Sequence, residues 1–380
     1  MMTSVCRPCD ADRIAWLTLK LTPGLGNRSI LRLARHFRSP TAVLQATGAA
    51  LAAVSGLRPQ ALRALLHNRP IRDPDAEWES LQDKGIRLVC LGDPDYPANL
   101  AVILDPPAVL FVQGSLEPRD LVSVAVVGSR SASALGMVFT EQLCADLARQ
   151  AVTVVSGMAV GIDSAAHRGA LKGDGRTLAV LGCGLDIDYP RANRKLREAV
   201  TQSGALISEF PLGALPEPGH FPSRNRIISG LALGVAVVEA GHRSGSLITA
   251  RLALEQGREV FAVPGLARHY RSIGPHRLLR DGAKLVESAA DIVQEIAPLV
   301  RSSGALQAET AARNAGACGN QNHTADETML LQLLQNVPMH IDELSHLLHW
   351  PASRAAAVLL ALELKGAVRQ LPGKSFVRVV

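Results

Sequence analysis

The chain has 380 residues, of which 47% are hydrophobic and 3% aromatic, enough for one large α/β core with one or two small domains. Its 40 Lys and Arg residues against 34 Asp and Glu residues give a net charge of +6, which permits nucleic-acid binding but excludes a histone-like tail. With no apolar run near the roughly 18 residues of a membrane span and no signal segment, we expect a cytoplasmic protein. Only Cys6 and Cys9 form a C-x-x-C pair, so no metal site is expected.

Residues 1–74 are predicted to form a small helical domain, similar to a SAM or helix-hairpin-helix domain. Apolar residues recur at i, i+3 and i+4 in short segments that Gly and Pro separate. Two turns, T-P-G-L-G-N-R at 22–28 and V-S-G-L-R-P-Q at 54–60, place Gly at a helix start. Such turns can offer backbone N–H groups to DNA phosphates. They are also ordinary turn and cap chemistry, so both interpretations stay open.

Residues 75–299 are predicted to form an extended Rossmann-like domain with a doubly wound, mostly parallel sheet. Apolar, β-branched runs alternate there with helix-length segments, a pattern typical of parallel strands that helices cover on both faces. The runs occupy residues 86–91, 108–112, 121–127, 152–156, 177–182, 205–210, 234–240, 259–264 and 283–287.

The last part of the chain is predicted to be a linker and a winged helix. Residues 300–325 are small, polar and aperiodic, which is typical of a flexible linker. Residues 326–380 predict three helices and a β-hairpin. The helix at 353–366 is rich in Ala and has Arg354 as its one basic residue before Lys365, so we favour protein contact or weak phosphate contact over the reading of duplex DNA.

Glycine-rich and polar segments follow five of the predicted strands. In an open parallel sheet, ligands bind at the carboxyl ends of the strands, so these segments should share one rim. The segments are 128–130, 156–163, 182–190, 209–226 and 241–250.

Three arginines of this rim, Arg130, Arg224 and Arg226, have no acidic residue beside them in the sequence. A guanidinium is permanently charged, and its planar fork suits a phosphate. Gly and Ser residues accompany them at helix starts, where backbone N–H groups also bind anions. Turn formation and helix capping explain any single loop equally well. Because five such loops share one rim, we expect an anion site there, with unpaired arginines.

A dinucleotide or ATP site does not fit this rim. The first turn after a parallel strand is G-S-R-S-A-S-A-L-G rather than G-x-G-x-x-G, and the chain has no G-x-x-x-x-G-K-[ST]. We therefore expect no cofactor.

Long motifs follow one another in collinear order over roughly residues 80–290. They are V-A-V-V-G-S-R at 124–130, the stretch from 154 to 171, the stretch from 178 to 196, I-S-E-F-P-L-G at 207–213, the stretch from 220 to 265, and G-P-H-R-L-L-R-D-G-A-K-L-V at 274–286. Together these motifs resemble the DprA (Smf) family of DNA-processing proteins. The resemblance implies a recombination mediator that binds and protects incoming single-stranded DNA and helps to load the RecA recombinase during natural transformation. It implies a homodimer without catalytic activity, and single-strand-binding protein is a further candidate partner.

The resemblance also implies roles for particular residues. The single-stranded-DNA-binding residues would be Gly128, Ser129, Arg130, Gly157, Phe221, Arg224, Asn225, Arg226, Ser244, Gly245 and Ser246. The dimer interface would contain His276 and Leu285, although many relatives have Cys where this chain has Pro275. Phe221, with Phe210 as a second candidate, is expected to stack on a base, the alternative being a core position. Because stacking needs unpaired bases, we expect single strands to be preferred over duplex.

Two other functions stay open. A nucleotide-processing hydrolase, similar to the lysine-decarboxylase-like phosphoribohydrolases, would use Glu209 or Glu239 as its acid, although the P-G-G-x-G-T-x-x-E stretch of those enzymes is absent. A regulator of duplex DNA would instead act through the winged helix.

Overall fold

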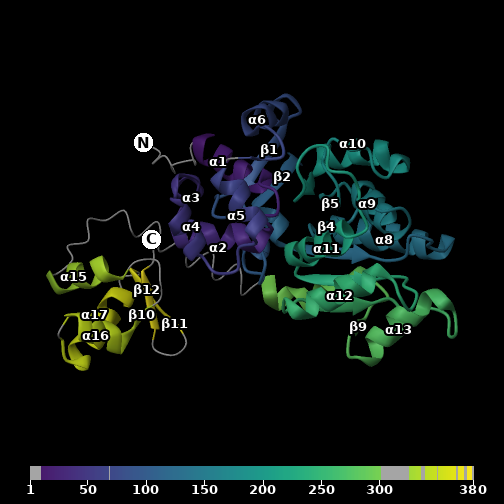
Figure 1. Cartoon of the computed structure of the whole chain (residues 1–380). Helices are drawn as coiled ribbons and strands as arrows, with labels where there is room; N and C mark the ends of the chain where they lie inside the picture. Colours follow the sequence, from purple (N-terminus) through teal and green to yellow (C-terminus); the bar gives the residue numbers. More distant parts are fainter. Residues whose placement is uncertain are drawn as a thin grey trace, which may run out of the picture. The chain divides into compact units, whose positions relative to one another are not determined.

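A computed structural model describes residues 10–67, 69–300, 325–334, 339–348, 350–364, 367–371 and 375–378. The chain divides into two compact units, residues 1–300 and residues 301–380 (Figure 1). The Cys6–Cys9 pair and nearly all of the predicted linker lie outside the described residues.

The first unit begins with a group of short helices. They are α1 (Asp10–Leu21), α2 (Asn27–Phe37), α3 (Pro40–Gln45), α4 (Gly48–Ala53), α5 (Pro59–Leu66) and α6 (Pro74–Asp83). The apolar spacing predicts helices over residues 13–21, 26–37, 40–47, 49–57 and 59–68, which overlap α1 to α5, but it does not predict α6. At α6 the side chain of Asp73 accepts a hydrogen bond from the N–H of Asp75, and Pro74 occupies the first helical position, both of which favour a helix start.

A nine-stranded sheet follows, with the strand order β1-β2-β6-β5-β4-β3-β7-β8-β9. The strands are β1 (Ile86–Cys90), β2 (Val109–Gly114), β3 (Ser123–Val127), β4 (Thr153–Ser156), β5 (Thr177–Leu181), β6 (Ala205–Ser208), β7 (Gly234–Val237), β8 (Glu259–Ala262) and β9 (Lys284–Leu285). Strand β2 pairs antiparallel with β1 and β6, and every other neighbouring pair is parallel. Each strand overlaps a predicted run, so the prediction of a mostly parallel, Rossmann-like sheet is confirmed.

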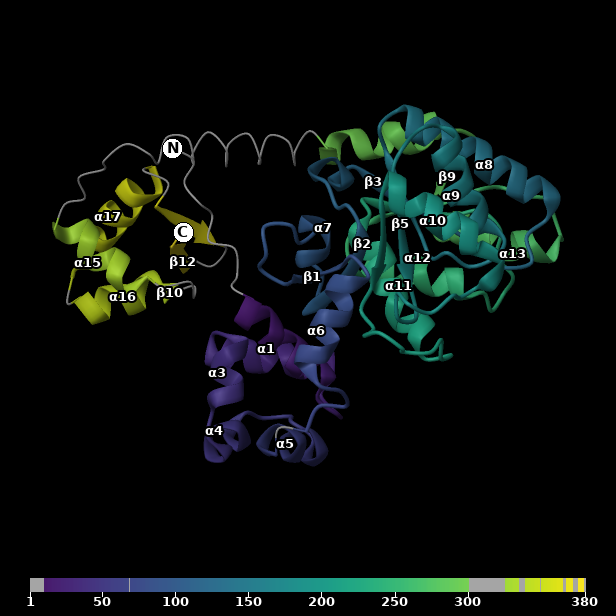
Figure 2. The ribbon, with the colours of Figure 1, turned by 90° about the horizontal axis from the view of Figure 1, so that it is seen from above.

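Helices cover both faces of this sheet. They are α7 (Ala98–Ala101), α8 (Ala134–Arg149), α9 (Ile162–Lys172), α10 (Arg194–Ser203), α11 (His220–Leu231), α12 (Gly245–Glu255) and α13 (Ile273–Arg280), with short 3₁₀ helices η1 (Pro118–Leu121), η2 (Arg191–Asn193) and η3 (Tyr270–Ser272). Figure 2 shows α8 and α9 on one side of the central strands and α11 and α12 on the other. None of the helices in the described part of the chain combines the length and hydrophobicity of a membrane span.

Alternating residues of the central strands supply the two cores. In β3, Val124 and Val126 pack with α8 and α9, whereas Ala125 and Val127 pack with α11 and α12. Successive side chains of a strand point to opposite faces, so a run that is apolar throughout fits a sheet covered on both sides. This packing holds the starts of α11 and α12 near the strand ends.

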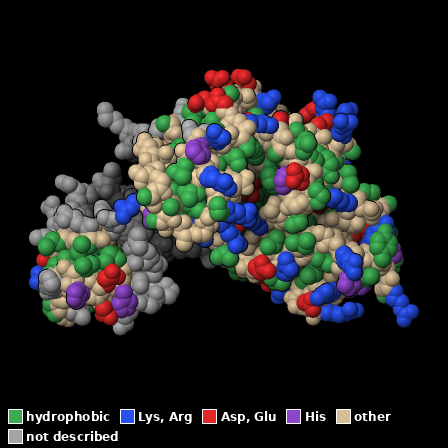
Figure 3. Space-filling view, viewed as in Figure 1, with side chains coloured by type: hydrophobic (Ala, Val, Ile, Leu, Met, Phe, Trp, Pro, Cys, Tyr) green, Lys and Arg blue, Asp and Glu red, His purple; other side chains and the backbone are tan. Residues whose placement is uncertain are grey.

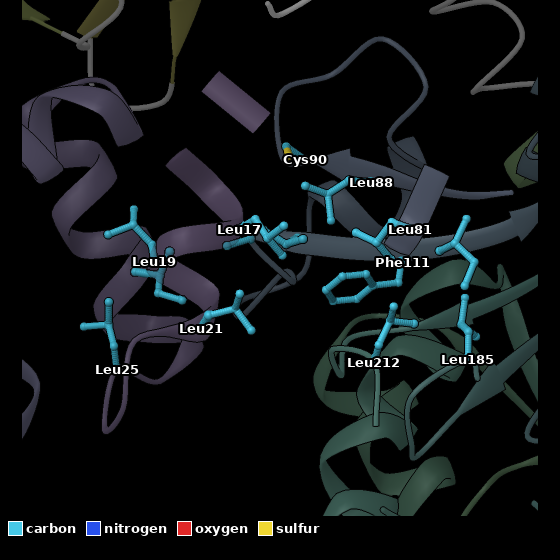
Figure 4. Packing of buried hydrophobic residues seen from close by; sticks show 14 of the residues in the cluster. Leu17, Leu19, Leu21, Leu25, Leu81, Leu88, Cys90, Phe111, Leu185 and Leu212 are labelled. Atoms are coloured by element: carbon cyan, nitrogen blue, oxygen red, sulfur yellow. The ribbon is translucent and has the colours of Figure 1, made fainter. Parts of the chain in front are cut away.

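The helical segment shares a hydrophobic core with the sheet. Leu17 and Leu19 of α1 and Leu81 of α6 belong to one buried cluster with Leu88 of β1 and Phe111 of β2, as Figure 4 shows. The helices and the sheet therefore form one compact unit. The predicted boundary between residues 74 and 75 stays a prediction.

Ion pairs also join the helical segment to the sheet. Arg226 of α11 donates two hydrogen bonds of 2.8 Å to the carboxylate of Glu209, which follows β6. The ammonium of Lys20, on α1, lies 3.7 Å from the same carboxylate. Asp105, in the loop after α7, lies 3.5 Å from Arg226. Burial lowers the pKa of Lys20, and the Glu209 carboxylate opposes that shift.

The second unit has the elements of the predicted winged helix. They are α15 (Ala325–Leu333), β10 (Met339–His340), α16 (Ile341–Leu348), α17 (Ala352–Leu364), β11 (Val368–Leu371) and β12 (Ser375–Arg378). Strands β11 and β12 pair antiparallel, and β10 adds to the other side of β12. The unit has its own hydrophobic core, which includes Leu330, Leu344 and Phe376.

Replacing Arg226 should destabilise the first unit. In Arg226→Met, the buried carboxylate of Glu209 loses the Nη2 group that donates to both of its oxygens, so we expect a loss of about 3 kcal/mol in the free energy of unfolding, measured by urea denaturation. Arg251→Met is the matched control, because Arg251 and its partner Glu255 are both exposed and should contribute less than about 0.5 kcal/mol. An unchanged free energy of unfolding in Arg226→Met would contradict the structural role.

Candidate functional site

The sheet opens a pocket where the strand order reverses. Strand β3 lies between β4 and β7; the chain leaves β3 toward β4 and returns to β7 only after β6. The loops that follow β3 and β7 therefore diverge, and ligands bind at such points in open α/β sheets. A pocket of about 530 Å³ lies there, lined by these two loops and by the first turns of α11 and α12.

Nine of the eleven predicted DNA-binding residues line this pocket. They are Gly128, Ser129, Arg130, Phe221, Arg224, Asn225, Ser244, Gly245 and Ser246. Gly157 and Arg226 are not part of its lining.

The loop after β3 packs closely against α9. A Cβ atom on Gly128 would lie 2.7 Å from the side chain of Ile162, so this approach requires glycine. The N–H of Ile162 donates to the carbonyl of Ser129 at 3.2 Å, and the Ser129 hydroxyl accepts from the N–H of Ser131 at 3.1 Å. The turn is thereby fixed, and it presents the exposed side chain of Arg130 at its tip.

Arg130 lies over the ring of Phe221, with 4.9 Å between the guanidinium carbon and the ring centroid. Phe221 is half-buried, and its ring lies 5.9 Å from that of Tyr189. The structure thus places Phe221 at the pocket wall. Phe210, the second candidate for stacking, packs instead on His220 with 4.0 Å between ring centroids and does not line the pocket.

Arg224 is a buried charge at the pocket floor, with 4% of its surface exposed. Its Nη1 donates to the carbonyls of Gly157, at 2.8 Å, and of Val180. Its Nε donates to the side-chain oxygen of Asn225 at 3.3 Å. Burial lowers the pKa of Arg224 to about 10, so the guanidinium keeps its charge at neutral pH. These hydrogen bonds fix the orientation of the Arg224 guanidinium.

The carboxylate of Asp163 accompanies Arg224 at the floor of the pocket. Asp163 is buried and lines the pocket. Burial raises its pKa, and the Arg224 guanidinium opposes that shift. A Cβ atom on Gly157 would lie 2.7 Å both from Nη2 of Arg224 and from Oδ2 of Asp163. Gly157 therefore leaves room for the two charged groups beneath the pocket.

The expectation that all three arginines are unpaired is wrong. Arg226 forms ion pairs with Glu209 and Asp105, and Arg224 lies near the buried charge of Asp163. Successive residues of an α-helix are about 100° apart, so Arg224 and Arg226 point to nearly opposite sides of α11. One faces the pocket and the other faces the helical segment.

The start of α12 forms the opposite wall. Ser244 caps this helix, and its hydroxyl lies 3.4 Å from the N–H and 2.7 Å from the hydroxyl of Ser246. The side-chain amide of Asn225 donates to the carbonyl of Gly245 at 3.3 Å, which ties α11 to α12. The capping interpretation therefore holds for Ser244, and Ser246 supplies the groups that the cap binds. The helix start still directs its partial positive charge toward the pocket.

Sequence reasoning missed Arg243, Tyr270 and Asp163, which also line the pocket. Arg243 directly precedes Ser244 after β7 and is exposed, so the rule that identified Arg130 would also have found it. Tyr270 is distant in sequence from the other lining residues, and no motif marked it. With Arg130, Arg224 and Arg243 against Asp163, the pocket suits an anion.

The two predicted dimer residues lie elsewhere. Nε2 of His276, on α13, lies 3.0 Å from the carbonyl of Gly265. Leu285 belongs to β9, the strand at one edge of the sheet, and 49% of its surface is exposed.

The residues named for the two alternative functions are already engaged. Glu209 pairs with Arg226, and Glu239 accepts hydrogen bonds from the N–H of Ser133 at 2.8 Å and from its hydroxyl at 2.5 Å; neither acid lines the pocket. In the winged helix, Nη2 of Arg354 lies 2.7 Å from Asp326. These contacts favour neither a catalytic acid nor a base-reading arginine.

Comparison with known proteins identifies the family. The family model of DNA recombination-mediator protein A matches residues 87–297, and the DprA winged helix domain matches residues 315–374. The chain is 34% identical to protein Smf of Synechocystis, over 97% of this chain and 99% of the relative. It is 38% identical to protein Smf of Escherichia coli, over 95% of each.

Two solved structures are similar to the chain. The X-ray structure of DNA processing protein A (DprA) from Streptococcus pneumoniae has a TM-score of 0.67 and 39% identity, covering 74% of this chain and 97% of that one. DNA processing protein A from Helicobacter pylori, described for its unique single-stranded DNA binding mode, has a TM-score of 0.50 and 28% identity, covering 56% of this chain and 96% of that one. The chain therefore belongs to the DNA recombination-mediator protein A (DprA, Smf) family.

Proposed function

We propose that this protein binds single-stranded DNA in the pocket between the ends of β3 and β7. In this role it would act as a recombination mediator that protects incoming strands and assists the loading of RecA during natural transformation. One observation carries the proposal: Arg130, Arg224 and Arg243 converge on one pocket with the starts of two helices. The single-stranded DNA binding described for the Helicobacter pylori relative supports it.

The three arginines would contribute to binding in different ways. Arg224 is fixed and buried, so it supplies a constant positive potential at the pocket floor without losing side-chain entropy on binding. Arg130 and Arg243 are exposed and can reach phosphates that pass the pocket mouth. Releasing the counterions of those phosphates drives binding and makes it salt-dependent.

Phe221 provides the preference for unpaired bases. Its ring already carries a guanidinium on one face, and a base that displaces Arg130 toward a phosphate can stack there for about 1–3 kcal/mol. In a duplex, base pairing and stacking keep the bases from this ring. Gly128, Asn225, Ser244, Gly245 and Ser246 shape the walls around it.

The supporting residues act indirectly. Gly157 makes room for Arg224 and Asp163, and Ser129 shapes the turn that carries Arg130. Arg226 holds the helical segment against α11 and does not contact DNA. The protein binds its strand without transforming it, so we propose no catalytic residue.

The proposed dimer interface surrounds β9. The outer edge of β9 has no partner strand within the described part of the chain, and exposed edges readily pair with another chain. Leu135 and Leu266 are 80% and 75% exposed and line a pocket that also includes Val286, next to Leu285. A second copy of the chain would cover this apolar surface.

Arg130→Ala and Arg224→Ala should each weaken the binding of single strands, whatever their sequence. Each variant removes a positive charge that faces the phosphates, so the slope of log K against log salt should become shallower by about 0.7 for every phosphate that is no longer neutralised. Fluorescence anisotropy of a labelled oligonucleotide at several salt concentrations measures both effects. Arg149→Ala, at an exposed position on α8, is the control.

Undiminished affinity in both pocket variants would refute the assignment of the site. A second check deletes residues 320–380. If that truncated chain no longer bound single strands, the winged helix would be the site instead.

Loading of RecA should depend on the pocket. On a strand coated with single-strand-binding protein, the wild-type chain should shorten the lag before RecA hydrolyses ATP, and Arg224→Ala should not, because it no longer holds the strand. If Arg224→Ala shortened the lag as well as the wild type, RecA loading would not use this pocket.

Leu285→Arg should convert the dimer to a monomer, because the substitution would bury an unpaired charge at a two-fold interface. Multi-angle light scattering gives the mass. Leu254→Arg is the control, since Leu254 is 61% exposed on α12. A dimer that persists in Leu285→Arg would remove β9 from the interface.

A further inference from the structure

All of the chain's excess positive charge comes from its N-terminal helices. Residues 13–72 contain ten Lys and Arg residues and no Asp or Glu, whereas the rest of the chain contains 30 Lys and Arg against 34 Asp and Glu. An acid-free stretch of this length is not needed for helix packing, since its apolar residues supply the core. The basic residues of this stretch therefore need another explanation.

Four of the ten basic residues pair with acids outside the stretch. These are Arg13, Lys20, Arg28 and Arg72. Within the described part of the chain, the other six have no carboxylate within salt-bridge distance, and all six are exposed. They are Arg32, Arg35, Arg38, Arg58, Arg63 and Arg69. Figure 3 shows some Lys and Arg side chains on this part of the surface, among hydrophobic and other side chains.

Basic side chains of α2 lie near the turn that leads to α5. Arg28, Arg32 and Arg35 are at i, i+4 and i+7 of α2, so they share one face, while Ile30 and Leu33 are buried on another. The guanidinium of Arg32 donates to the carbonyl of Ser55, in the turn that leads to α5. We call the surface formed by Arg28, Arg32, Arg35, Arg58 and Arg63 the α2–α5 basic surface.

Two turns of the same geometry bring the helix starts into this surface. Gly24 and Gly56 have φ angles of +77° and +79°, which favour glycine. A Cβ atom on Gly24 would lie 3.4 Å from the backbone nitrogen of Ala61, so the two turns are neighbours. Neither α2 nor α5 has a side-chain hydrogen bond at its N-cap, which leaves first-turn N–H groups for an anion.

The α2–α5 basic surface adjoins α11, the helix that forms one wall of the pocket. Nε of Arg28 and Nε of Arg226 lie 3.7 Å and 3.5 Å from the same oxygen of Asp105. Arg226 belongs to α11, the helix that supplies Arg224 and Asn225 to the pocket. The α2–α5 basic surface and the pocket are therefore connected through opposite sides of α11.

We propose that the α2–α5 basic surface is a second contact site for the phosphates of the strand held in the pocket, an inference that rests on the proposed function. Exposed arginines and open helix starts bind a phosphodiester backbone without reading bases. The second site lengthens the bound segment. Long strands therefore bind more tightly than short ones through contacts that the pocket alone does not supply.

The test compares two strand lengths with two charge-matched variants of the full chain. Arg35→Gln/Arg58→Gln/Arg63→Gln removes three charges from the α2–α5 basic surface. Arg149→Gln/Arg168→Gln/Arg251→Gln removes three exposed charges from α8, α9 and α12. The short oligonucleotide has about six nucleotides, which is near the low end of the site size of a single binding fold. The long one has about thirty nucleotides, which is well beyond that site size.

The α2–α5 variant should bind the long strand about tenfold or more weakly, with a salt slope shallower by about two because three phosphates are no longer neutralised. Its affinity for the short strand should stay within about twofold of wild type, and the control variant should match wild type on both strands. Equally weakened binding of both strands, or unchanged binding of both, would overturn the proposal. The proposal would also be overturned if the wild-type and control chains bound anionic lipid vesicles and the α2–α5 variant did not, while the DNA affinity of that variant was unchanged.

The outcome is separable from that of the proposed function. If Arg130→Ala and Arg224→Ala both left short-strand affinity unchanged, the pocket assignment would fail. Weaker binding of the long strand alone in the α2–α5 variant would still identify the basic surface as a DNA contact.

Discussion

The reversal of strand order beside β3 determines where the site lies. Because the chain leaves β3 toward β4 and comes back to β7, the two following loops separate, and the starts of α11 and α12 close the space between them. Both helices are held by the apolar core on their own side of the sheet. The positions of Arg224 and Arg243 thus follow from packing that lies far from any ligand.

Burial gives the charges of α11 different tasks. Arg224 and Asp163 are both buried at the floor of the pocket, and Gly157 leaves the room that their charged groups need. Arg226, on the other side of the helix, joins Glu209, Asp105 and Lys20 at the contact with α1. One helix therefore carries both a ligand-facing charge and a structural one, and the helical segment is tied to the helix that forms the pocket wall.

Much of this arrangement could be predicted from the sequence, because the apolar runs that form parallel strands and the rule for ligand positions are local signals. They indicated the nine strands and placed Arg130, Phe221 and Arg224 near one rim. The pairing of Arg226 could not be predicted, since Glu209 and Asp105 are distant in sequence and the direction of a helical side chain depends on packing. Asp163 was missed for the same reason, and α6 was missed although Asp73 and Pro74 marked its start.

An unpaired strand should lie across the pocket at the ends of β3 and β7. Photo-cross-linking of the full chain to a single-stranded oligonucleotide that carries photoreactive bases, followed by mass spectrometry of the peptides, reports where the strand lies. We predict cross-links in residues 128–131, 221–225 and 241–249, the segments that line the pocket. Cross-links found only in the second unit, residues 301–380, would contradict this placement of the strand.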